Sequence, residues 1–68
     1  MVARNENNEK QARALYDFEG ERKKELTFSK GDILTVTRKI DANWYEGYNG
    51  EEKGIFPITY VELLDEGL

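Results

Sequence analysis

The sequence contains no cysteine and no histidine in its 68 residues. Without them the chain can form no disulfide, and zinc loses its usual sulfur and nitrogen ligands. Ser29 is the only serine and has no candidate base, so nucleophilic catalysis lacks its parts. No acidic spacing matches a calcium loop, and Gly47, Gly50 and Gly54 do not form a phosphate-binding fingerprint. We therefore expect no enzymatic activity, no metal and no cofactor.

Long apolar runs are also missing. No stretch approaches the roughly 20 apolar residues of a membrane helix, and the first residues lack the apolar core of a signal peptide. The net charge is −4, and the sequence pI is about 4.8. Because a negative chain is repelled by polyanions, nucleic acid and anionic membranes are poor candidates as partners. We expect a soluble, cytoplasmic domain.

The composition divides the chain into three parts. Residues 1–11 are rich in asparagine, glutamate and lysine and have almost nothing apolar to bury, which predicts a disordered leader or linker. Residues 66–68 are interpreted in the same way, as a disordered tail. Residues 12–65 form the predicted folded unit, which is one small domain with a marginal core.

Apolar residues within this unit recur with a period of two, which predicts short strands. The expected strands include Ile33–Arg38, Trp44–Tyr48, Glu52–Phe56 and a final Val61–Leu64. Between the second and third of these, Asn49-Gly50 favours a tight hairpin turn. Pro57, the only proline, should end its strand, and residues 58–60 are short enough for a single 3-10 turn. Five short strands in so small a chain predict an all-β fold, a strongly bent barrel.

The predicted core consists of small and apolar residues on the inner face of these strands. We expect the following positions to be buried: Ala12, Ala14, Leu26, Phe28, Leu34, Val36, Gly47, Phe56 and Val61.

Six short segments in register resemble the Src-homology-3 (SH3) family over nearly all of Ala12–Leu64. In chain order they are ALYDF at Ala14–Phe18, ELTF at Glu25–Phe28, KGD at Lys30–Asp32, Trp44-Tyr45, Asn49-Gly50 and the Pro57…Tyr60-Val61 ending. The segments around Trp44 and Pro57 look like adaptor-type members of the ponsin/vinexin and endophilin groups. The resemblance implies an SH3-like barrel that binds Pro-x-x-Pro peptides, as part of an adaptor or scaffold protein.

A receptor for such a peptide needs flat walls and a few donors. A polyproline II helix presents its prolines as ridges and leaves its carbonyls free, so aromatic walls can hold the ridges while hydroxyl and indole groups donate to the carbonyls. Five residues supply these walls, and the resemblance assigns the same five to the ligand groove: Tyr16, Phe18, Trp44, Pro57 and Tyr60. Because the ligand is already extended, little entropy is lost on binding.

Acidic residues near the groove suggest that the ligand carries arginine or lysine. The resemblance places Glu25 at an acidic ligand-contacting position in a long loop, and Asp41 precedes Trp44 as a second acidic candidate. A carboxylate beside an indole face suits a cation through charge and cation–π contact. The chain departs from the family at Arg22–Lys24, where a basic triplet occupies a loop that is usually more acidic. This triplet weakens the expected attraction for a basic ligand and favours one with an acidic flank.

Other interpretations of these residues remain open. Tyr16 and Phe18 are also compatible with an aromatic pair that only covers the core, and Trp44 with a core anchor. For the whole domain, the alternatives to a peptide-binding monomer are a small-barrel nucleic-acid binder and a structural domain that self-associates through a strand edge. The sequence identifies neither the partner, nor the ligand orientation, nor the parent protein.

Overall fold

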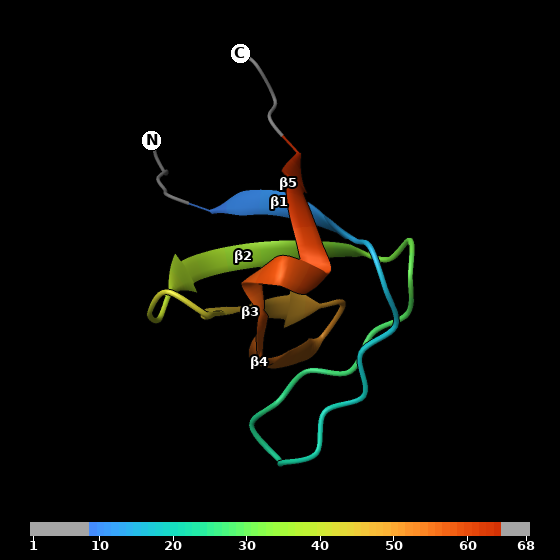
Figure 1. Ribbon diagram of the computed structural model, residues 1–68, viewed down its shortest axis with the longest axis vertical. Helices are drawn as coiled ribbons and strands as arrows, with labels where there is room; N and C mark the ends of the chain where they lie inside the picture. The colour runs from blue at the N-terminus through green and yellow to red at the C-terminus, as the bar shows by residue number, and fades with distance from the viewer. Residues whose placement is uncertain (1–8, 65–68) are drawn as a thin grey trace.

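The computed structural model describes residues 9–64, which form a single five-stranded sheet (Figure 1). The elements in chain order are β1 (Lys10–Ala14), β2 (Ile33–Lys39), β3 (Trp44–Asn49), β4 (Glu52–Pro57), the 3-10 turn η1 (Ile58–Tyr60) and β5 (Val61–Leu64). The all-β prediction is confirmed, as is the single 3-10 turn before the last strand. The four strands for which the sequence predicted both ends begin and end within one residue of those predictions.

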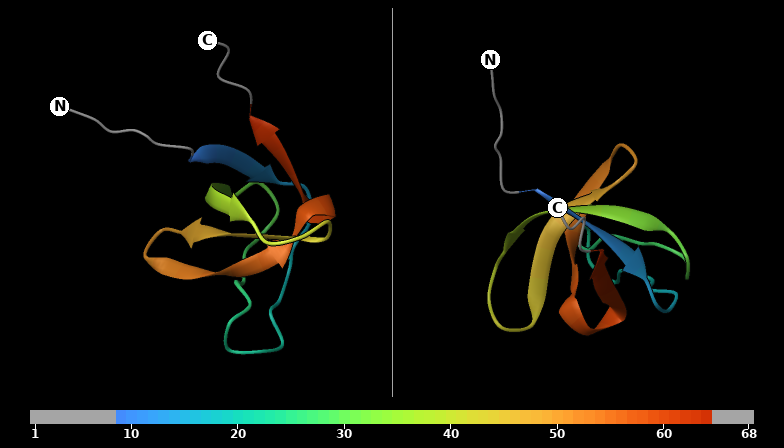
Figure 2. Two further views of the ribbon diagram at one scale, coloured as in Figure 1. Left: turned by 90° about the vertical axis from the view of Figure 1, so that its left-hand side faces the viewer. Right: turned by 90° about the horizontal axis from the view of Figure 1, so that it is seen from above.

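The sheet is bent into a barrel because its two edges are close in sequence. The strand order is β4-β3-β2-β1-β5, with every neighbouring pair antiparallel, so β4 and β5 form opposite edges. Only the three residues of η1 join these edges, and the sheet must curl to bring them together (Figure 2). An irregular register between Val36 and Arg38 adds to the bend, as a bulge does in an antiparallel pair.

The start of the folded unit lies earlier than the composition indicates. Strand β1 begins at Lys10, where Lys10 pairs with Val36 of β2, two residues before the expected boundary at Ala12. Residues 1–8 of the expected leader, and the expected tail at 66–68, lie outside the described residues. Among residues 9–64, no helix is long and apolar enough to cross a membrane.

All nine residues predicted to be buried are buried, and eight of them, all except Gly47, form the hydrophobic core cluster. Phe56 and Leu34 are its largest fully buried side chains, and Phe18, Tyr45 and Tyr60 pack against it from outside. Gly47 is buried opposite Gly54 in the β3–β4 pair. A Cβ atom at Gly47 would overlap the Thr35 carbonyl, so only glycine allows β2 and β3 to approach this closely.

The β3–β4 hairpin is present, but its turn is shifted by one residue from the predicted position. Asn49 pairs with Glu52 at the end of β3, so Gly50 and Glu51 are the two loop residues, and Gly50 has a φ of +66°. The Asn49 side-chain amide instead donates hydrogen bonds to the Thr27 carbonyl and the Asp32 carboxylate, both at 3.3 Å. These bonds keep Asn49 in the sheet, and glycine takes the first position of the tight loop.

Candidate functional site

Three aromatic rings form a contiguous row on the surface. Tyr16 and Phe18 lie on the segment that follows β1, and Tyr60 ends η1. The Tyr60 ring lies between the other two, with centroids 5.5 Å from Tyr16 and 5.4 Å from Phe18 in edge-to-face geometry. The Leu15 N–H donates to the Tyr60 carbonyl at 2.8 Å and fastens the two segments together. Tyr16 is 57% exposed, so this row presents an open aromatic surface.

Trp44 and Pro57 form a second part of the site. They are directly paired at the start of β3 and the end of β4. Tyr45 packs against the core, and since side chains alternate along a strand, Trp44 lies on the opposite, outer face. Trp44 is half-buried and is not a member of the buried core cluster. The interpretation of Trp44 as a sealed core anchor therefore does not hold.

One helical turn joins the two parts. Pro57 directly precedes η1, and the Ile58 N–H donates to the Asn43 carbonyl at 2.9 Å, which holds the start of η1 beside the residue before Trp44. Tyr60 ends the same turn. The short distance along the chain from Pro57 to Tyr60 places the Trp44–Pro57 pair and the aromatic row at neighbouring positions on the barrel.

An open hollow of about 480 Å³ lies at the aromatic row. Tyr16, Asp17, Thr59 and Tyr60 line it, whereas Trp44 and Pro57 do not. Asp17 and Thr59 were not singled out from the sequence, although each is the neighbour of a predicted groove residue. The Asp17 carboxylate accepts a hydrogen bond from the Lys30 N–H at 2.8 Å, which ties the first aromatic segment to the turn before β2.

Glu25 lies beside the edge strand β4, in the long loop between Phe18 and Phe28. It bridges Ile55, two residues before Pro57, and the Leu26 N–H donates to the Ile55 carbonyl at 2.9 Å. Its own Oε1 accepts the Glu21 N–H at 2.8 Å. One carboxylate oxygen is therefore used to close the loop, and Oε2 accepts no hydrogen bond from residues 9–64. The half-buried Glu25 carries a charge whose position is set by the loop it closes.

Asp41 has a structural function that the sequence analysis did not predict. Its Oδ1 accepts hydrogen bonds from the N–H groups of Asn43 at 2.8 Å and Trp44 at 3.1 Å. These bonds shape the turn that leads into β3 and so orient the start of the strand that carries Trp44. Asp41 is nevertheless exposed, as the position of a ligand-contacting acid requires.

The basic triplet Arg22–Lys24 is exposed throughout. Within the described part of the chain, the ion pairs are Arg13–Glu62 and Arg38–Glu46, and neither involves the triplet. Three cations therefore stand on the loop that Glu25 closes.

A small bent sheet whose surface carries aromatic side chains in a row is typical of domains that recognise extended peptides. The SH3 domain family model matches residues 13–58, and the chain belongs to this family. SH3 domains are modules that bind proline-rich peptides in adaptor proteins.

Among curated relatives, the chain is 60% identical over 52 residues to endophilin-A1 of Mus musculus, covering 76% of this chain and 15% of that protein. It is 57% identical over 53 residues to sorbin and SH3 domain-containing protein 2 of Homo sapiens, covering 78% of this chain and 5% of that protein. These relatives confirm the resemblance to the endophilin and ponsin/vinexin groups. The chain spans only a small part of either relative.

Two solved structures with bound peptides have the same fold. The C-terminal SH3 domain of myosin IB from Entamoeba histolytica, bound to a peptide, is 32% identical with a TM-score of 0.81, covering 88% of this chain and all of that one. The yeast Nbp2p SH3 domain in complex with a Ste20p peptide is 33% identical with a TM-score of 0.82, covering 90% of this chain and 94% of that one.

Proposed function

We propose that this domain binds a Pro-x-x-Pro segment of another protein through Tyr16, Phe18, Trp44, Pro57 and Tyr60. The observation that carries the proposal is the open row of three contacting rings next to the outward-facing Trp44–Pro57 pair. Such rigid rings offer flat walls for the ridges of a polyproline II helix, and the tyrosine hydroxyls and the indole N–H can donate to its free carbonyls. The domain would act as a monomeric, non-catalytic module of a cytoplasmic adaptor or scaffold protein.

A peptide titration tests this proposal. A Pro-x-x-Pro peptide carrying one arginine should change the fluorescence emission of Trp44, the only tryptophan, and bind with a Kd on the order of micromolar, or about −8 kcal/mol. The matched control is the same peptide with both prolines replaced by alanine, which lacks the preformed helix and should bind far more weakly. No spectral change and no heat at millimolar peptide would defeat the proposal.

A basic ligand residue is proposed to contact Glu25, with Asp41 as a second acidic neighbour. Oε2 of Glu25, which accepts no hydrogen bond from residues 9–64, is available for a charge-assisted hydrogen bond, and the bridge to Ile55 holds this residue near the Trp44–Pro57 pair. The exposed cations of Arg22–Lys24 oppose this attraction, so the charge contribution should be modest. The same cations favour a ligand with an acidic residue outside its proline core.

Glu25→Gln should weaken binding of the arginine-containing peptide about three- to tenfold, since a partly exposed charge pair contributes on the order of 1 kcal/mol. The glutamine carbonyl can still accept the Glu21 N–H, so the loop should keep its conformation. Calorimetry with two peptides, one with arginine and one with glutamine at the same position, measures the difference. An equal loss of affinity for both peptides would show that Glu25 does not interact with the charged residue of the ligand.

A further inference from the structure

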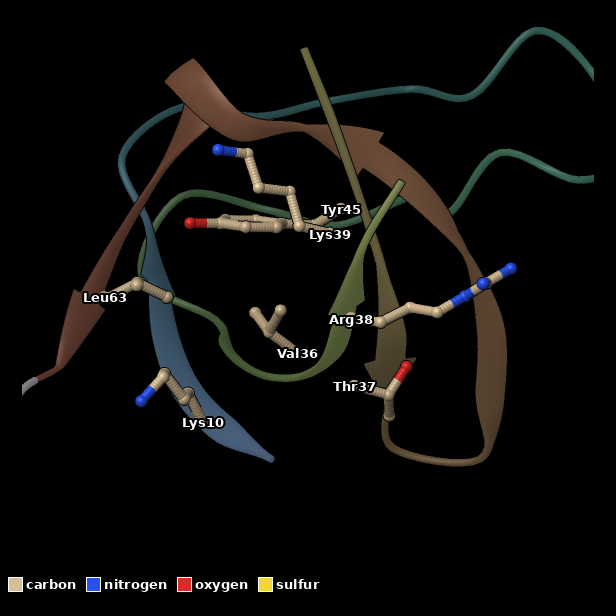
Figure 3. A pocket seen from close by; sticks show the side chains of 7 residues that line it. All are labelled: Lys10, Val36, Thr37, Arg38, Lys39, Tyr45 and Leu63. Atoms are coloured by element: carbon tan, nitrogen blue, oxygen red, sulfur yellow. The ribbon is translucent and has the colours of Figure 1, made fainter. Parts of the chain in front are cut away.

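A second hollow, of about 370 Å³, lies at one end of the barrel and shares no residue with the proposed groove (Figure 3). Val36, Tyr45 and Leu63 form its apolar part, and Lys10, Arg38 and Lys39 supply its charges. These residues come from four strands, β1, β2, β3 and β5.

The hollow is the uncovered mouth of the barrel core. Alternate residues of a strand share a face, so Lys10 lies on the same face as buried Ala12, and Leu63 on the same face as buried Val61. By the same alternation, Tyr45 shares a face with buried Gly47. The inward-facing row of each strand thus continues past the packed core, and within residues 9–64 no further layer covers it. This is why Leu63 remains 42% exposed although it faces inward.

The charges at this mouth have one sign. None of the residues that line it is acidic. Arg38 is paired with Glu46, and Figure 3 shows its side chain directed away from Val36 and Leu63. Neither lysine takes part in the ion pairs formed within residues 9–64. Lys39 is the sheet partner of Tyr45, and Lys10 is the sheet partner of Val36, so both lysines lie beside apolar residues of the mouth.

We propose that this mouth is a second binding site, for a short acidic segment of a partner protein that inserts one apolar side chain. The apolar side chain would contact Val36, Tyr45 and Leu63, and carboxylates on either side of it would pair with Lys10 and Lys39. In a chain of net charge −4, a two-lysine rim without an acidic lining residue selects for negative charge in the ligand. The mouths of barrels are common ligand sites, and the volume is within the range of small binding pockets. Because the residues differ from those of the proline-binding groove, both segments could be bound at once.

A selection experiment tests the site. A peptide library with the fixed pattern acidic–apolar–acidic, and random residues on both sides, is selected on the wild-type domain. Enriched peptides are then titrated against the Lys10→Glu/Lys39→Glu double variant and against a matched control, Lys30→Glu/Lys53→Glu. The control makes the same charge change at two exposed lysines that do not line the mouth. We expect the Lys10→Glu/Lys39→Glu variant to lose at least tenfold in affinity, and the control variant to lose less than threefold. Replacing the central apolar residue of the peptide by serine should abolish binding to the wild-type domain.

Three results would overturn the proposal. The first is a library without enriched peptides, or peptides that bind both double variants equally. The second is sedimentation showing that the wild-type domain dimerises and the Lys10→Glu/Lys39→Glu variant does not, which would assign the mouth to a second copy of the chain. The third is lysine-dependent binding to phosphatidylserine vesicles without any peptide binding, which would assign it to a lipid surface. Thermal unfolding of each variant, with unchanged binding of the proline-rich peptide, confirms that the substitutions leave the fold intact.

Discussion

Trp44→Ala should lower the affinity for a proline-rich peptide by about thirtyfold or more while the domain stays folded. The substitution removes both the flat indole wall and its N–H donor, and central aromatic residues of this kind cost about 2 kcal/mol or more when truncated. The fold should survive because Trp44 lies on the outer face of β3 and outside the buried core cluster. Calorimetric titration measures the affinity, and circular dichroism during heating measures the stability.

Tyr48→Ala is the matched control for this experiment. Tyr48 lies four residues further along β3 on the same outer face, is an exposed aromatic residue, and does not belong to the proposed groove. Its replacement should leave peptide affinity within about threefold of the wild-type value. If Trp44→Ala unfolds the domain, the residue is structural. If it folds and binds normally, the groove lies elsewhere on the surface.

Phe56→Ala should lower the free energy of unfolding by about 3–5 kcal/mol, which is a large part of the stability of so small a domain. Phe56 is completely buried, and its ring contacts Phe28 and Tyr45 at centroid distances of 5.7 and 6.0 Å. Truncation removes these contacts and leaves a cavity. A domain of this size has a total stability of about 3–8 kcal/mol, from roughly 0.05–0.15 kcal/mol per residue. Urea denaturation followed by circular dichroism measures the difference.

Ile33→Ala provides the comparison for this loss. Ile33 is in β2 and is 48% exposed, so its truncation removes less apolar contact and should cost no more than about 1 kcal/mol. A similar loss for both variants would mean that Phe56 is not the centre of the core.

The period-two pattern predicted the strands and the core because the alternation of buried and exposed residues along a strand is visible in the local sequence. Each strand has one face toward the interior, so alternate residues such as Leu34 and Val36 are apolar, whichever strands they pair with. The end of β4 at Pro57 and the 3-10 turn after it could also be predicted, since proline has no N–H to continue the hydrogen bonding of the sheet. The same alternation placed Trp44 and Tyr45 on opposite faces of β3. The ligand roles of the groove residues remain predictions.

The hydrogen-bond partners of individual side chains, and the open end of the barrel, were determined only by the tertiary structure. Nothing in the local sequence shows that Glu25 and Asp41 accept backbone N–H groups of their own loops, or that Asn49 reaches Thr27 and so moves the hairpin turn by one residue. The second hollow is built by Lys10, Val36, Tyr45 and Leu63, whose strands are paired across the sheet. Alternation states which way each of these side chains points, but the pairing register between distant strands determines where they meet and what is left uncovered.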